Sequence, residues 1–297
     1  MSAALLLLPD FLLIGLGALL RRSRLFDSAF WGGVERLVYF VLFPALLFRS
    51  LASSPLSPAD AGRLAAVGLG FTAAGMALSA LARPLFRLPE PTFAACFQCG
   101  FRFNTYVALA AASRLGGAEG VALMSVLLGL LVPVVNVAAV AMLARGRGMP
   151  VVGAIARNPL VLACIAGLAW NFARLPLPGL PARVLELLAA AALPLGLLAV
   201  GAGLKFDRST LPWPALAWWN AVKLVALPAI AYVLAPMAGL SPLERQIAVV
   251  MAAVPTATSA YILAVQMNGV GAPVAMLISS GTLLAAVTLP LWIAALV

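Results

Sequence analysis

The feature that most constrains this chain is a succession of apolar blocks, each about 20 residues long. A helix of that length crosses the hydrocarbon core of a bilayer. Hydrophobic residues make up 64% of the chain and charged residues 9%, so a soluble fold could not cover the apolar surface. The sequence therefore predicts an all-α integral membrane protein with ten transmembrane helices in a lipid bilayer.

The predicted spans are separated by short segments rich in Pro, Gly, Ser and Arg. The spans cover residues 3–20, 28–50, 61–82, 91–112, 119–143, 158–174, 183–203, 212–236, 242–266 and 272–296. None of the separators is long enough to fold as a domain of its own, so the whole chain is expected to be embedded in the membrane.

The basic residues lie in short runs between the apolar blocks, which is typical of membrane-protein loops and not of a nucleic-acid-binding patch. With the N-terminus outside, the cytoplasmic loops hold Arg21, Arg22, Arg24, Arg83, Arg87, Arg145, Arg147, Arg157, Lys205 and Arg208. The opposite loops hold Arg49, Arg63, Arg114, Arg174, Arg183 and Arg245. This distribution predicts that both termini lie outside a bacterial-type inner (plasma) membrane.

The two halves of the chain resemble each other at an offset of about 150 residues. Corresponding positions are Val34–Pro44 with Val184–Pro194, Pro9 with Pro159, Gly17 with Gly167, Pro84 with Pro236 and Tyr106 with Tyr261. Residues 1–143 form the predicted first repeat, 144–157 a cytoplasmic connecting loop and 158–297 the second repeat. Because each repeat has an odd number of spans, the second is inverted, as is typical of secondary transporters with a site near the midplane.

The fourth and ninth spans contain polar, helix-disfavouring segments at corresponding places, Gln98–Tyr106 and Pro255–Tyr261. Opened backbone at membrane depth persists where it is buried or lines a cavity. Both segments are therefore candidate walls of a cavity. The alternative interpretation is that their small polar residues serve helix–helix packing. The predicted substrate-binding residues are Arg102, Asn104, Thr105, Tyr106, Asn136, Thr256, Thr258, Ser259 and Tyr261.

Three of the charged residues inside the predicted spans are candidates for a functional charge, because a charge at membrane depth is costly and usually has a partner. Arg102 has two interpretations: a counter-charge for an anionic substrate, or a structural ion pair with Asp10 or another acid. Lys223 has the same two interpretations. Asp10 is either a coupling residue for a proton or cation, or a residue at the start of a helix. No metal or cofactor is expected, since the chain has no histidine and Cys96 and Cys99 lie within an apolar block.

Four segments together resemble the auxin efflux carrier family: Arg102–Tyr106, Leu115–Gly120, Val132–Asn136 and Val254–Ala264. That family includes the plant PIN proteins and bacterial malonate carriers. The resemblance implies a five-plus-five inverted repeat, a scaffold of helices 1, 2, 6 and 7, a mobile part made of the others, and broken helices 4 and 9 that cross at the site.

The resemblance also implies a binding position for the substrate. Plant members bind a carboxylate near an asparagine, which maps to Asn104. Ala110 or Ala111, and Ala260, stand where the crossing prolines of the family are expected.

The resulting hypothesis is a secondary transporter that moves a small organic anion, a mono- or dicarboxylate, by alternating access. A sodium-coupled carrier of the related bile-acid type is one alternative, so protons and Na⁺ both remain candidate coupling ions. An integral-membrane enzyme is the other, but the sequence offers no set of nucleophile, metal ligands and base. The sequence is also compatible with a homodimer.

Overall fold

The computed structural model describes residues 3–23, 25–53, 58–144, 159–177, 179–204, 211–267 and 269–296. Within these ranges the regular structure is entirely helical. The predicted connecting loop from residue 145 onward, and Arg24, Arg145, Arg147, Arg157, Lys205 and Arg208, lie outside the described residues.

In the described ranges, the α-helices follow one another along the chain with three short π or 3₁₀ turns between them. They are α1 (Ala3–Arg22), α2 (Ser28–Leu37), η1 (Val38–Leu42), α3 (Phe43–Ala52), α4 (Pro58–Phe86), α5 (Glu90–Phe97), η2 (Gln98–Gly100), α6 (Thr105–Leu143), α8 (Pro159–Phe172), α9 (Gly179–Ala202), α10 (Trp213–Ala221), η3 (Val222–Ala226), α11 (Leu227–Met237), α12 (Pro242–Ala253), α13 (Ser259–Gln266) and α14 (Gly271–Ala294).

Among the described residues, five helical stretches are long and apolar enough to cross a membrane. They are Ala61–Phe86, Glu90–Leu143, Gly179–Ala202, Trp213–Met237 and Gly271–Ala294, and Leu162–Phe172 is a shorter apolar helix. The predicted class, an all-helical multi-pass membrane protein, is confirmed.

Large apolar side chains point outward along the outer helices. Leu12 and Leu19 of α1 are 62% and 64% exposed, and Val287 and Leu291 of α14 are each 63% exposed. A water-soluble protein rarely exposes so much contiguous apolar surface. These faces are suited to lipid tails. The backbone N–H and C=O groups are hydrogen-bonded within each helix and need no water.

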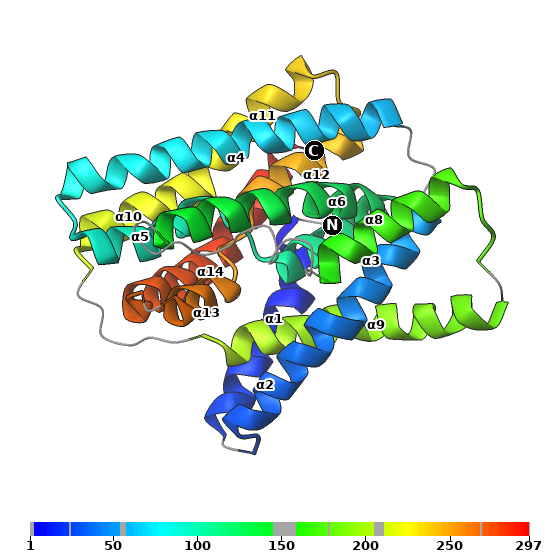
Figure 1. Cartoon of the computed structure of the whole chain (residues 1–297), viewed down its shortest axis with the longest axis horizontal. Helices are drawn as coiled ribbons and strands as arrows, with labels where there is room; N and C mark the ends of the chain where they lie inside the picture. Colours follow the sequence, from blue (N-terminus) through cyan, green and yellow to red (C-terminus); the bar gives the residue numbers. More distant parts are fainter. Residues whose placement is uncertain are drawn as a thin grey trace.

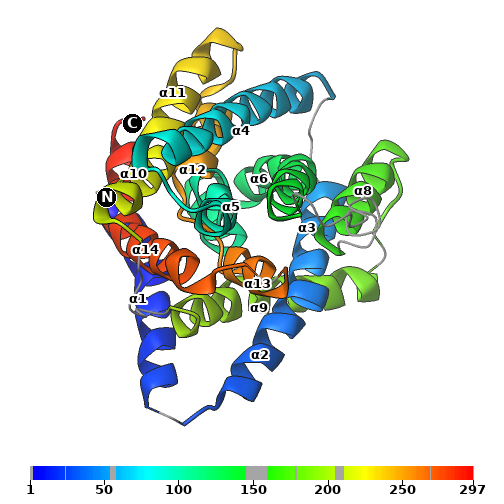
Figure 2. The same cartoon turned by 60° about the vertical axis from the view of Figure 1, so that its left-hand side comes forward.

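The helices form two groups, with α6 between them (Figure 1). In the first group α1 packs against α9, and α3 packs against both α8 and α9. The second group contains α4, α5, α10, α11, α12 and α14, and Figure 2 shows α5 near its centre. α6 contacts members of both groups and so connects them.

Glycines allow helices of the first group to touch backbone to backbone. A Cβ at Gly17 of α1 would overlap the carbonyl group of Leu198 on α9. A Cβ at Gly167 of α8 would lie 2.9 Å from the carbonyl oxygen of Phe48 on α3. Small residues permit this close approach of membrane helices, where packing is a main driving force.

Two helices are interrupted midway. After α5 and η2 the chain is non-helical through residues 101–104 and turns helical again at Thr105. After α12 it is non-helical through residues 254–258 and turns helical again at Ser259. Asn104 and Pro255 disfavour a continuous helix there. The predicted opening of the backbone in both segments is confirmed.

Candidate functional site

The two helix interruptions lie against each other, and each forms hydrogen bonds with backbone groups that the other leaves without a helical partner. The backbone N–H of Asn104 donates to the carbonyl oxygen of Pro255 at 2.7 Å. The Thr256 hydroxyl donates to the carbonyl oxygen of Cys99 at 2.7 Å, and the Gln98 amide donates to that of Ala260 at 3.1 Å. Non-helical backbone is therefore tolerated here because its hydrogen bonds are made within the protein.

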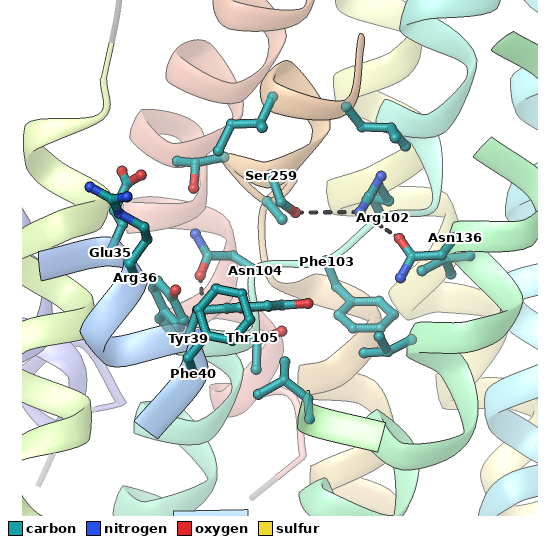
Figure 3. A pocket seen from close by; sticks show the side chains of 18 residues that line it. Glu35, Arg36, Tyr39, Phe40, Arg102, Phe103, Asn104, Thr105, Asn136 and Ser259 are labelled. Atoms are coloured by element: carbon teal, nitrogen blue, oxygen red, sulfur yellow. Dashed lines mark hydrogen bonds between the residues drawn. The ribbon is translucent and has the colours of Figure 1, made fainter. Parts of the chain in front are cut away.

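A cavity of about 500 Å³ opens beside this meeting point (Figure 3). Its walls come from α2 and η1, the 101–104 segment, α6, α8, the 254–258 segment and α13. The lining residues are Glu35, Arg36, Tyr39, Phe40, Arg102, Phe103, Asn104, Thr105, Tyr106, Val132, Val135, Asn136, Leu160, Ala257, Thr258, Ser259, Ile262 and Leu263. Most of the exposed area of the wall is apolar, and polar groups from several elements converge on it, as is typical of a small-molecule site.

Arg102 is the buried cation of this cavity, with 7% of its surface exposed. One terminal nitrogen donates to Oε1 of Gln98 at 2.7 Å. The other donates to Oδ1 of Asn136 at 2.7 Å and to the Ser259 hydroxyl at 3.4 Å, so the guanidinium lies between α6 and α13 (Figure 3). All three partners are neutral, so these hydrogen bonds orient the positive charge without cancelling it.

Two helices begin at the cavity wall. Oδ1 of Asn104 caps α6 by accepting from the backbone N–H groups of Tyr106 and Val107, at 3.0 and 3.3 Å. α13 begins at Ser259, and Thr258 and Ser259 both line the cavity. Because the N-terminal end of a helix carries a partial positive charge, both ends add to the field of Arg102. The cavity wall is thus electrostatically suited to an anion.

The cavity brings together most of the residues predicted to bind substrate: Arg102, Asn104, Thr105, Tyr106, Asn136, Thr258 and Ser259. Thr256 and Tyr261 lie outside its lining. Thr256 is 4% exposed and its hydroxyl is bonded to Cys99, because that side of the extended segment faces η2. The ring of Tyr261 lies on the α14 side of α13, where it faces Gly271.

The two other charged candidates lie elsewhere. Asp10 forms an ion pair with Arg114 of α6, at 3.3 Å, so the interpretation of an Asp10–Arg102 pair is wrong. Lys223, in the π-helical turn η3, is buried and donates to the carbonyl oxygen of Ala252, near the C-terminal end of α12. A cation near a helix C-terminus is favourable because that end carries partial negative charge.

Sequence reasoning missed the wall that α2 and η1 contribute. Glu35 and Tyr39 are four residues apart, as are Arg36 and Phe40, so all four side chains project to one side of this helical segment, into the cavity (Figure 3). A charged pair followed one turn later by two aromatic residues was the signal that could have pointed to this wall. Gln98 was also missed as the residue that holds Arg102.

Comparison with known families bears on the second half of the chain. Residues 150–293 match the family model described as a membrane transport protein. These residues carry an auxin efflux carrier family domain. The auxin efflux carrier domain includes Thr258 and Ser259 of the cavity, whereas Arg102 and Asn104 precede it. No curated protein matches the chain. The domain indicates a membrane transporter, which implies a bilayer and a transported substrate.

Two substitutions at Asn104 are expected to separate the effect of losing the helix cap from the effect of adding a negative charge to the cavity wall. Asn104→Ala removes the cap of α6 and should destabilise the protein by about 0.5–2 kcal/mol. Asn104→Asp keeps a capping oxygen but places a negative charge in the cavity wall, so it should bind anions more weakly than Asn104→Ala does. Thermal unfolding in detergent and carboxylate binding to the same preparations measure the two effects. Equal anion affinity in both variants would contradict the electrostatic role.

Proposed function

We propose that this protein is a secondary transporter that moves a small organic anion, a mono- or dicarboxylate, across the membrane by alternating access. The observation that carries the proposal is the position of Arg102, a buried guanidinium on a cavity wall whose hydrogen-bond partners are all neutral. A charge in a membrane interior calls for a compensating partner. A carboxylate substrate in the cavity would supply one, since the guanidinium fork matches a carboxylate.

The membrane topology that we propose has ten spans. The apolar stretch Glu90–Leu143 contains 54 residues, and as one straight helix it would be about 80 Å long. A bilayer core is only about 30 Å thick. Gly117, with φ 54° and ψ −133°, interrupts the helix geometry near the middle of this stretch. These features support two spans, one on each side of Gly117.

Close contacts and backbone geometry support an inverted repeat. An offset of 150 exchanges the two glycine contacts, because Gly17 with Leu198 becomes Gly167 with Phe48. A contact pair that maps onto another in this way is the signature of a twofold axis. Arg87 and Gly239, with φ of 48° and 68°, each immediately precede a leucine and then a helix that is interrupted midway. With five spans in each half, the axis lies in the membrane plane.

The grouping of helices supports the mechanism. The first group, α1 to α3 with α8 and α9, corresponds to the scaffold that the family resemblance implies. The cavity lies where α2 and η1 of this group face the two interrupted helices of the other. Movement of one group against the other would carry the interrupted helices, and an anion bound to them, from one membrane face to the other.

Uptake into proteoliposomes tests the proposed function. The purified protein is reconstituted, and a panel of radiolabelled mono- and dicarboxylates is supplied outside, with neutral and cationic solutes as comparison. We expect at least one carboxylate to accumulate above protein-free liposomes and the neutral and cationic solutes not to. Replacing Na⁺ by choline, and adding a protonophore, distinguishes a sodium-coupled carrier from proton-coupled or uncoupled transport. Uptake of none of the carboxylates would contradict the proposal.

A further inference from the structure

A second cavity, of about 680 Å³, lies further along the same helices. It opens between α3, α6 and α9, and Arg49, Ser50, Ser113, Glu119 and Glu186 contribute polar groups to its wall. Glu186 lies 3.9 Å from Arg49, and both side chains are more than 40% exposed. Its charged and exposed wall is suited to water, and it has no residue in common with the first cavity.

Only a thin layer of protein separates the two cavities. On the segment from η1 to α3, Phe40 lines the first cavity and Leu46 the second, six residues later. On α6, Tyr106 lines the first and Ser113 the second, seven residues later. At 1.5 Å of rise per residue these separations are about 9 and 10 Å. One layer of large side chains fills that thickness.

That layer is an aromatic stack. The ring of Phe43, which is 0% exposed, stacks on the ring of Tyr106 with centroids 4.6 Å apart and planes 18° apart. Gly196 of α9 lies directly behind both rings, since a Cβ there would meet Phe43 at 3.0 Å and Tyr106 at 3.2 Å. Residues 107–112 of α6 are all buried. The stack and the α9 backbone thus close the space between the cavities.

A π-helical turn positions this stack. The turn η1 ends at Leu42, immediately before Phe43. An extra residue in a turn rotates the residues that follow around the helix axis, so η1 decides which face Phe43 occupies. Such π-turns occur frequently at functional sites.

We infer that the second cavity is the opposite vestibule of the substrate route, and that the Phe43–Tyr106 stack is the barrier that closes the first cavity from it. This inference rests on the proposed transport function, because it takes the first cavity to be the substrate site. The barrier stands at the junction of the helix groups: Phe43 and Gly196 belong to the first group, whereas Tyr106 is on α6, beside the interrupted segment.

A leak assay tests the barrier. The protein is reconstituted into liposomes that contain a chloride-quenched dye, and the initial rate of chloride entry is measured. Phe43→Ala removes the ring from a single-layer barrier and should join the two cavities, whose walls contain Arg102 and Arg49. We expect chloride entry to rise on the order of tenfold over the unmodified protein, as when an apolar constriction is wetted.

Phe48→Ala is the matched control, because it removes the same ring from the same helix. Phe48 packs edge-on against Trp170, with centroids 5.8 Å apart, and lines neither cavity. We expect no rise in chloride entry from this variant. Phe43→Leu, a smaller loss of volume, should leak at an intermediate rate and serves if Phe43→Ala does not reconstitute.

Chloride entry at the unmodified rate in a folded Phe43→Ala or Phe43→Leu protein would overturn the barrier, as would an equal leak through Phe48→Ala. The leak assay needs no transported carboxylate. The absence of carboxylate uptake by the unmodified protein therefore counts against the proposed function, whereas the absence of a leak counts against the barrier alone.

Discussion

Replacing Arg102 by glutamine is expected to weaken carboxylate binding by roughly 1.5–3 kcal/mol, or about 10- to 150-fold in Kd. The guanidinium is held by neutral partners, so removing it takes positive charge from the cavity without freeing an acid. Arg102→Lys should restore only part of the affinity, because an ammonium lacks the planar fork. The measurement is titration calorimetry of the purified variants with the carboxylate that the uptake panel identifies.

Arg114→Gln is the control for this experiment. It also removes one guanidinium, but Arg114 is half-exposed, pairs with Asp10 and lies outside the lining of the first cavity. We expect its carboxylate affinity to equal that of the unmodified protein. Unchanged affinity in a well-folded Arg102→Gln protein would refute the substrate role of Arg102, and the anion site would then depend on Asn104 and the two helix ends.

Gly17→Ala is expected to be among the most destabilising single-methyl changes in the chain. The new Cβ would overlap the carbonyl group of Leu198, so α1 and α9 must separate along their contact. Overpacking of this kind costs about 1–3 kcal/mol, and a clash with backbone cannot be relieved by a side-chain rotation. We expect a thermal midpoint several degrees lower, or loss of monodisperse protein, measured by scanning fluorimetry in detergent.

Two other glycines set the scale for this result. Gly15 lies on the same helix, and a Cβ there would meet nothing within 4 Å, so Gly15→Ala should be neutral or slightly stabilising. Gly167→Ala should be intermediate, because its Cβ would meet the Phe48 carbonyl oxygen at 2.9 Å. Equal midpoints for Gly15→Ala and Gly17→Ala would show that α1 and α9 do not pack in this way.

The helical class and the two interruptions could be predicted from the sequence because both depend on local composition. Apolar blocks of about 20 residues form helices in a bilayer, where the backbone must satisfy its own hydrogen bonds. Asn104 and Pro255 lie at the two interruptions, where residue type alone disfavours an uninterrupted helix. Two of the four segments that carry the family resemblance contain these interruptions, and residues 150–293 match the auxin efflux carrier family domain.

Side-chain direction within an extended segment could not be predicted. Thr256 and Thr258 are two residues apart and chemically identical. The hydroxyl of Thr256 donates a hydrogen bond to the carbonyl oxygen of Cys99, whereas Thr258 lines the cavity. Irregular backbone has no fixed period from which a face can be read, unlike a helix. The neighbours packed around the 254–258 segment decide which hydroxyl is used internally.

The sequence by itself determined that this chain is helical, lies in a membrane and is interrupted at two places, since these properties follow from residue types in short windows. Only the tertiary structure decided which partners the buried charged residues have. Asp10 pairs with Arg114, 104 residues away, and Arg102 binds Asn136 and Ser259, 34 and 157 residues away. Such partners are chosen by how helices pack, because packing alone brings residues far apart in the chain within hydrogen-bond distance.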